Sequence, residues 1–160
     1  MATTVADVMT RELLTVRPDT PVQEAVQLLA EKRISGLPVI DEQQRLVGVL
    51  SETDLMWQVT GAQVPAYITL LDSVIYLENP ARYNQELHKA LGQTVSELMT
   101  NKPITVAPDE SIRKAAQIMH DKQIRRLVVI DEAKTVVGVL TRGDIVREMA
   151  KNYSERSQTA

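Results

Sequence analysis

Residues 136–144 have the sequence Val-Val-Gly-Val-Leu-Thr-Arg-Gly-Asp, and residues 46–54 have the similar sequence Leu-Val-Gly-Val-Leu-Ser-Glu-Thr-Asp. Each stretch predicts a buried β-strand that ends at a hydroxyl residue and runs into a helix with an aspartate in its first turn. This pattern has two interpretations. The aspartate can simply cap the helix. Alternatively, the helix N-terminus can attract phosphate while the carboxylate accepts hydrogen bonds from ribose hydroxyls.

The two stretches belong to an internal repeat. Residues 5–59 align with residues 95–149 without a gap at a constant offset of 90, and about 21 of about 55 aligned residues are identical. Each copy predicts a short capped helix, an extended segment, an amphipathic helix, two strands and a closing helix. One copy is too small to bury its apolar faces, so we expect the copies to pack together. Because both copies keep the hydroxyl and the aspartate, the repeat favours ligand binding over capping alone.

Four segments follow from this pattern. Residues 1–59 form the first repeat, 60–93 an insert, 94–151 the second repeat, and 152–160 a polar tail that we expect to fray. The insert predicts a helix that begins at Pro65 and a second that follows Asn79-Pro80 and ends at Gly92. The apolar face of the first helix would consist of Tyr67, Leu70, Leu71, Val74 and Leu77.

Aromatic residues gather in and beside this insert, and two interpretations of it remain open. Four of the five tyrosines and tryptophans lie between Trp57 and Tyr83. Such residues suit an interface, so the insert could contact a second copy or a partner protein. It could equally pack on its own repeats.

Composition excludes several classes of protein. Without Cys, the chain has no disulfide, thiolate metal site or thiol nucleophile. A net charge of -3 and no long Lys/Arg run argue against a nucleic-acid partner. No apolar run could span a bilayer and no secretion signal is present, so we expect a cytoplasmic protein without a membrane partner. His88 and His120 lack metal-ligand spacing and no catalytic motif is present, so we expect neither a metal site nor an enzyme.

In combination, the motifs resemble those of tandem CBS-domain proteins, which are paired regulatory modules that bind adenosine-containing ligands. The resemblance covers both repeats and rests on Met-Thr, Thr-Val-x-Pro-Asp, Val-Ile-Asp, Gly-Val-Leu and Ser/Thr-x-x-Asp. It implies an α/β fold of two pseudo-symmetric repeats, each β-α-β-β-α, with two clefts available between them and pairing of modules into a homodimer. The long insert resembles that of small stand-alone CBS-pair proteins from photosynthetic lineages.

The resemblance also implies a function. It predicts a stand-alone regulatory module that binds AMP, ADP or ATP, with or without Mg²⁺, and signals energy state to an unidentified target protein by a conformational change. One alternative is a ligand-free assembly module that dimerises through its helices. Another is a sensor of S-adenosylmethionine or a cyclic dinucleotide. The residues do not distinguish these ligands, because the adenosine contacts are shared.

The family pattern transfers onto two sets of residues. In each set the aspartate would hold the ribose hydroxyls and the Ser or Thr before it would lie near phosphate. Thr15 and Thr105 would lie beside the base, with Val16 and Val106 as apolar walls, and the segments at 34–38 and 124–127 would line the adenine. Site 1 comprises Thr15, Val16, Ile34, Gly36, Leu37, Pro38, Ser51 and Asp54. Site 2 comprises Thr105, Val106, Ile124, Arg125, Arg126, Leu127, Thr141, Arg142 and Asp144.

The two sites differ in charge. Site 2 has Arg125, Arg126 and Arg142 where the first repeat has Ser35, Gly36 and Glu52. Guanidinium groups bind phosphate oxygens through paired, charge-assisted hydrogen bonds. We therefore predict that site 2 binds a nucleotide more tightly than site 1.

Overall fold

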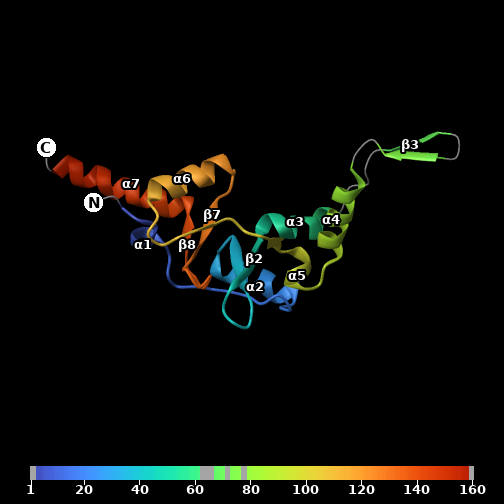
Figure 1. Cartoon of the computed structure of the whole chain (residues 1–160), viewed down its shortest axis with the longest axis horizontal. Coiled ribbons are helices and arrows are strands. Elements are labelled where there is room, and N and C mark those ends of the chain that lie inside the picture. The colour runs from blue at the N-terminus through green and yellow to red at the C-terminus, as the bar shows by residue number, and fades with distance from the viewer. Residues whose placement is uncertain (1–2, 62–66, 71–72, 77–78, 159–160) are drawn as a thin grey trace. The chain divides into compact units, whose positions relative to one another are not determined.

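The computed structural model describes residues 3–61, 67–70, 73–76 and 79–158 (Figure 1). Its contacts divide the chain into two units, each assembled from segments that are distant in sequence. Unit 1 contains Met1–Thr15, Ile40–Val47 and Lys102–Ala160, and unit 2 contains Val16–Val39 and Gly48–Asn101. The predicted α/β fold is confirmed, since both units combine a sheet with helices.

Unit 1 is built on a three-stranded sheet with the order β6-β7-β8. β6 runs parallel to β7, and β7 runs antiparallel to β8. Unit 1 contains the strands and helices predicted for the second repeat, except its short capped helix, and contains the capped helix of the first repeat instead. They are β6 (Thr105–Val106), α6 (Ile112–Asp121), β7 (Arg126–Ile130), β8 (Val136–Thr141) and α7 (Arg142–Gln158), together with α1 (Val5–Val8).

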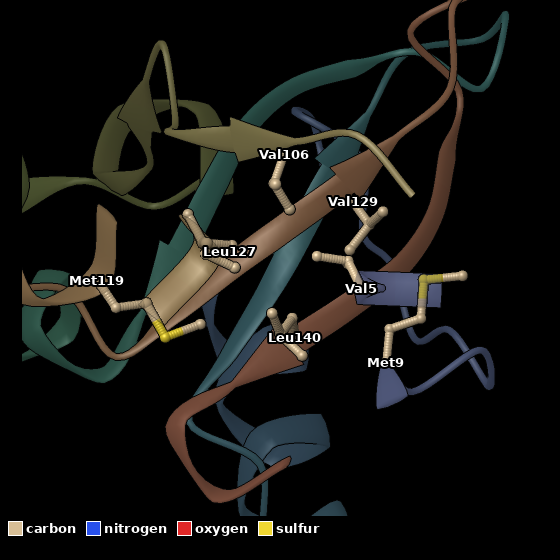
Figure 2. Packing of buried hydrophobic residues seen from close by; sticks show 8 residues of the cluster. Val5, Met9, Val106, Met119, Leu127, Val129 and Leu140 are labelled. Carbon is tan, nitrogen blue, oxygen red and sulfur yellow. The ribbon is translucent and has the colours of Figure 1, made fainter. Parts of the chain in front are cut away.

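The core of unit 1 lies between this sheet and its helices. Figure 2 shows side chains from β6, β7 and β8 gathered with those of the α1 region. Burying such apolar side chains supplies the main driving force for folding. The buried cluster consists of Val5, Met9, Val106, Ala115, Met119, Leu127, Val129 and Leu140.

Unit 2 repeats this arrangement with the first copy. Its sheet has the order β1-β2-β5, and β2 pairs antiparallel with β5. Val16 forms a parallel bridge with Val39, as β6 does with β7 in unit 1. The elements are α2 (Val22–Lys32), β1 (Gly36–Ile40), β2 (Leu46–Ser51), α3 (Glu52–Thr60), β3 (Tyr67–Leu70), β4 (Ser73–Tyr76), α4 (Pro80–Leu91), α5 (Val95–Leu98) and β5 (Thr100–Asn101).

The short N-terminal helix of each repeat belongs to the unit built mainly from the other repeat. In unit 1, the backbone N–H of Val5 donates to the carbonyl of Glu110 at 2.8 Å. In unit 2, the N–H of Val95 donates to the carbonyl of Thr20 at 2.9 Å. The sequence repeats and the compact units therefore do not coincide. Each unit contains the short N-terminal helix of the other repeat.

Glycine in the Gly-Val-Leu motif allows this exchange. A Cβ atom on Gly138 would overlap the sulfur of Met9 and lie 3.1 Å from the carbonyl oxygen of Thr10. A Cβ on Gly48 would meet Met99 and the Thr100 carbonyl in the same way. The absence of a side chain lets the Met-Thr segment pair with the strand, as Thr10 does with Val139.

The prediction of a helix beginning at Pro65 is wrong where the structure describes the insert. β3 and β4 form an antiparallel hairpin in which Tyr67 pairs with Tyr76 and Leu70 with Ser73. β-Branched and aromatic residues dominate both strands, and these residues favour strands over helices. Pro65, Leu71 and Leu77 lie outside the described residues. The insert is thus not wholly helical.

The second helix of the insert is confirmed as α4, and the C-terminal tail differs from its prediction. The Oδ1 atom of Asn79 accepts a hydrogen bond from Ala81 N at 3.0 Å, with Pro80 in the first turn, as the sequence predicted. α7 continues to Gln158, so the tail predicted to fray is helical up to that residue. Lys151 lies 3.8 Å from Glu148 one turn earlier, a pairing that favours helix.

Three carboxylates make the fold sensitive to acid. Hydrogen bonds from backbone N–H groups hold the pKa values of Asp7, Asp41 and Glu97 below their ordinary range. A lowered pKa in the folded state contributes stability above the unfolded pKa, and this contribution is lost as pH falls through the folded value. We expect the free energy of unfolding to fall as pH drops below about 4. Urea titrations of the triple variant Asp7→Asn, Asp41→Asn, Glu97→Gln should show a shallower pH dependence, and an unchanged slope would contradict this assignment.

Candidate functional site

In both units the motif loop lies where a strand passes directly into a helix. β8 ends at Thr141 and α7 begins at Arg142, while β2 ends at Ser51 and α3 begins at Glu52 (Figure 1). The helix start leaves backbone N–H groups without intrahelical partners beside the hydroxyl residue. A phosphate would be favoured at such a position.

Asp144 is the buried carboxylate of site 2, with 5% of its surface exposed. Its Oδ2 atom accepts hydrogen bonds from Thr141 N at 2.7 Å and Thr141 Oγ1 at 2.8 Å. Its Oδ1 atom pairs with Arg147 of the same helix, whose side chain is 70% exposed. Asp144 therefore does cap α7, but the capping hydrogen bonds use only one of its two carboxylate oxygens.

Asp54 of site 1 makes the same cap and has different partners on its other oxygen. Its Oδ2 atom accepts from Ser51 N at 2.9 Å and Ser51 Oγ at 3.1 Å. Its Oδ1 atom accepts from Lys89 Nζ at 2.5 Å and Thr100 Oγ1 at 3.3 Å. Sequence reasoning missed both donors. Thr100 lies in the repeated Met-Thr motif, which could have pointed to it, whereas no periodicity marks Lys89.

The base-side segments lie beside the motif loops. Arg142 N donates to the Arg125 carbonyl at 3.1 Å, and Arg126 stands opposite Thr141 in the sheet. In unit 2, Glu52 N donates to the Ser35 carbonyl at 3.1 Å. The structure thus brings residues 124–127 together with Thr141, and residues 34–36 together with the start of α3.

Several predicted site residues are core residues. Val106 and Leu127 belong to the buried cluster of unit 1, and Val16, Leu37 and Pro38 are buried as well. Leu127 is fully buried and Val106 nearly so, so both side chains pack in the core of unit 1. Ile34, Gly36, Ile124 and Thr105 are half-buried. Thr15 ends the first segment of unit 1, while the rest of site 1 lies in unit 2.

The three arginines of site 2 are in different situations. Arg142 donates from Nε to the Ile124 carbonyl at 3.1 Å and from Nη2 to the Met119 carbonyl at 3.5 Å, so its guanidinium holds the end of α6. Arg126 is half-buried. Arg125 is exposed, and its side chain has no hydrogen bond or ion pair to any other described residue. Arg125 is thus the site 2 arginine that an exposed phosphate could reach without breaking a contact to the described residues.

A cavity of about 470 Å³ lies at the opposite end of this sheet. Thr105 and Val106 line it with Ile130, whereas Thr141 pairs with Arg126 at the other end of β7. Asp109, Asp131 and Glu132 also line it, and their negative charge disfavours phosphate. The cavity therefore brings together only Thr105 and Val106 of the predicted site 2.

Over residues 3–61, 67–70, 73–76 and 79–158, no three His, Asp or Glu side chains are grouped so that they could hold a metal ion. Within the same ranges, no helix has the length and apolar character needed to cross a bilayer.

Comparison with known proteins identifies the family of this chain. The CBS domain model matches residues 5–61 and 95–151. The chain is 37% identical over 150 residues to the CBS domain-containing protein CBSX1, chloroplastic, of Arabidopsis thaliana, covering 90% of this chain and 63% of that protein. This chain thus spans a little less than two thirds of the length of that relative.

Solved structures agree with this assignment. A crystal structure of CBSX2 in complex with AMP matches with a TM-score of 0.77 at 35% identity, covering 92% of this chain and 97% of that one. The CBS domain pair of protein MJ0100, in complex with 5-methylthioadenosine and S-adenosyl-L-methionine, matches with a TM-score of 0.67 at 25% identity, covering 92% and 99%. With both sequence repeats matched by one family model and the motif loops placed alike in both units, this chain belongs to the CBS-domain family as a protein with two CBS domains.

Proposed function

We propose that this protein is a regulatory module that binds an adenosine-containing nucleotide at site 2 and passes that signal to a partner protein. The observation that carries the proposal is the position of Asp144, a buried carboxylate at the start of α7, beside Thr141 and the Arg125-Arg126 segment. A carboxylate offers about four acceptor positions, and the described residues fill three of them at Asp144. The exposed side chain of Arg147 can turn into solvent and release a further position.

The chemistry of the three neighbouring groups suits a nucleoside phosphate. Asp144 would accept hydrogen bonds from ribose hydroxyls, which as charge-assisted bonds are stronger than neutral ones. Arg125 would pair with phosphate oxygens. The helix N-terminus favours the same negative charge. The AMP complex of CBSX2, at 35% identity, supports AMP as the first ligand to test.

We further propose that ADP and ATP bind the same site, with or without Mg²⁺, and that binding shifts the protein between two arrangements. A ligand moves such an equilibrium only by binding one arrangement more tightly. The changed surface would then be recognised by the target protein. S-adenosylmethionine is the alternative ligand that the MJ0100 complex supports.

A second candidate function, a ligand-free assembly module, has one observation in its favour. A groove of about 670 Å³ in unit 2 is lined by Val26, Leu55, Met56 and Val59 among others, and Val59 is 82% exposed. Exposed apolar patches of this kind mark protein interaction sites. The same groove supports homodimer formation under the nucleotide-binding proposal.

Thermal unfolding with and without nucleotide tests the proposal. A ligand that binds only the folded state adds about 2.7 kcal/mol of stability at 100 times its Kd. For a chain of this size that corresponds to a rise in Tm of roughly 5–10 °C. We expect such a rise with AMP, ADP or ATP and none with GMP as a control. No shift with any adenosine compound would contradict nucleotide binding and favour the assembly module.

A further inference from the structure

We propose that Lys89, from the insert between the repeats, is a built-in competitor for the ribose position of site 1. The inference rests on the proposed function, because it assigns a regulatory role to a residue at the nucleotide site. Lys89 lies on α4, and its ammonium group reaches Asp54, which is 35 residues earlier in the sequence. Among the described residues, the ion pair of the counterpart in unit 1, Asp144, is with Arg147 of its own helix.

The acceptor positions of Asp54 are all occupied by donors of the described residues. Four donors reach this carboxylate: Lys89 Nζ and Thr100 Oγ1 on Oδ1, and the N and Oγ atoms of Ser51 on Oδ2. A carboxylate has about four acceptor positions, so these donors fill it. Asp54 is 4% exposed, so little of it is open to water. A ribose hydroxyl must displace one donor to bind.

The four donors on Asp54 differ in how easily they can leave. The Ser51 bonds cap α3 and are local to the chain. Thr100 lies on β5, which pairs with β2. Lys89 is held by its own long side chain, which is 26% exposed and can therefore be hydrated after release. Lys89 is the donor that a ribose would replace.

Contacts between α3 and α4 hold Lys89 beside Asp54. Gln58, one turn after Asp54 on α3, donates from its side-chain amide to the carbonyls of Lys89 at 2.5 Å, Ala90 at 3.2 Å and Gly92 at 3.1 Å. One face of α3 thus holds both the main chain and the side chain of Lys89. Because the Gln58 bonds do not involve the ammonium group, the side chain can swing away while α4 stays in place.

The consequence is a difference between the sites that does not depend on phosphate. Asp54 is occupied by a lysine from the insert, whereas the arginine on Asp144 is 70% exposed and lies on the same helix. The position of Gln58 is occupied by Glu148 in the second repeat, which pairs with Lys151. Site 1 is therefore self-inhibited by the insert, and site 2 is not.

The test removes the lysine in a chain whose site 2 has been weakened. In the Asp144→Asn background, isothermal titration with AMP reports site 1, and adding Lys89→Met should tighten that binding about tenfold, the scale of losing one charged competitor. Lys89→Arg keeps a cation on Asp54 and should give no gain. Lys32→Met removes a positive charge from the end of α2 that makes no hydrogen bond or ion pair with Asp54, and should also give no gain.

Equal or weaker binding in the Lys89→Met variant would overturn the inference, because Lys89 would then be neutral or a ligand contact. If that variant does not fold, Lys89→Gln, which keeps a polar side chain without the charge, replaces it with the same expectation. A ligand-free readout is the NMR signal of the Lys89 ammonium, which should be protected from exchange in the Asp144→Asn chain and lose protection with Asp54→Asn. No protected signal would overturn the inference as well. If AMP binds site 2 of the unaltered chain while Lys89→Met has no effect, only this inference fails; absence of any AMP binding refutes the proposed function.

Discussion

Asp144→Asn is expected to lower the affinity of site 2 for AMP by about 100-fold. The asparagine side chain has the same shape, and its amide oxygen can still accept the Thr141 N–H that Asp144 accepts at 2.7 Å. It lacks the negative charge that would strengthen the ribose contacts. Hydrogen bonds to charged groups contribute about 1.5–3 kcal/mol each, and a loss of about 2.7 kcal/mol corresponds to the expected 100-fold. Isothermal titration with AMP measures the change.

The matched control is the same substitution in the first repeat. Asp54→Asn should leave the affinity of the tighter site within about twofold, because Asp54 and Asp144 share no hydrogen-bond partner and substitutions at such sites act nearly independently. Both variants keep an N3 side chain that can accept the capping hydrogen bond, so they should remain folded. The order of the sites is refuted if the tighter binding event survives Asp144→Asn and disappears with Asp54→Asn. In that case the arginines of site 2 would have a role other than binding phosphate.

The repeat and the motif loops could be predicted from the sequence because their causes are local. The capping of α7 by Thr141 and Asp144 depends only on residues three positions apart, and the structure shows the expected bonds. The strand before this loop was predicted from a continuous apolar run, and β8 occupies the same residues. Both features occur again at an offset of 90, and this repetition made a chance match to the pattern less plausible.

The features that the sequence did not predict depend on contacts between distant segments. α1 packs in the unit built mainly from the second repeat, and α5 in the unit built mainly from the first. This exchange does not change the pattern of apolar residues within either helix, so the sequence pattern could not reveal it. Arg142 was predicted to bind phosphate from its place in the loop, whereas its guanidinium holds the Ile124 and Met119 carbonyls. Lys89 reaches Asp54 from a segment with no counterpart in the other repeat, so no internal comparison could identify it.

The hairpin β3–β4 was missed for another reason. The spacing of Tyr67, Leu70 and Val74 fits a helix face as well as it fits two short strands. Short apolar runs are ambiguous by periodicity alone, and the composition of the strands, rich in Ile, Val, Thr and Tyr, was the better guide. Length also mattered, because each strand has only four residues.

Leu140→Ala is expected to lower the free energy of unfolding by about 2–5 kcal/mol, the range for large-to-small substitutions in a packed core. Leu140 is fully buried in the cluster that β6, β7 and β8 form with α1, and it directly precedes Thr141 (Figure 2). Loss of its packing should therefore also loosen the motif loop and weaken AMP binding at site 2. Urea unfolding measures the first effect, and isothermal titration measures the second.

Leu50→Ala is the matched control, since Leu50 is equally buried and directly precedes Ser51 in unit 2. It should cost a similar free energy of unfolding while leaving the titration at site 2 nearly unchanged. Leu140→Met, which conserves volume, should cost less than about 1.5 kcal/mol. In the Leu140→Ala variant, the backbone amides of β7, β8 and α7 should exchange hydrogen faster than in the unaltered chain. If Leu50→Ala and Leu140→Ala lowered the affinity of site 2 for AMP equally, the prediction that the geometry of site 2 depends on the core of unit 1 alone would be wrong.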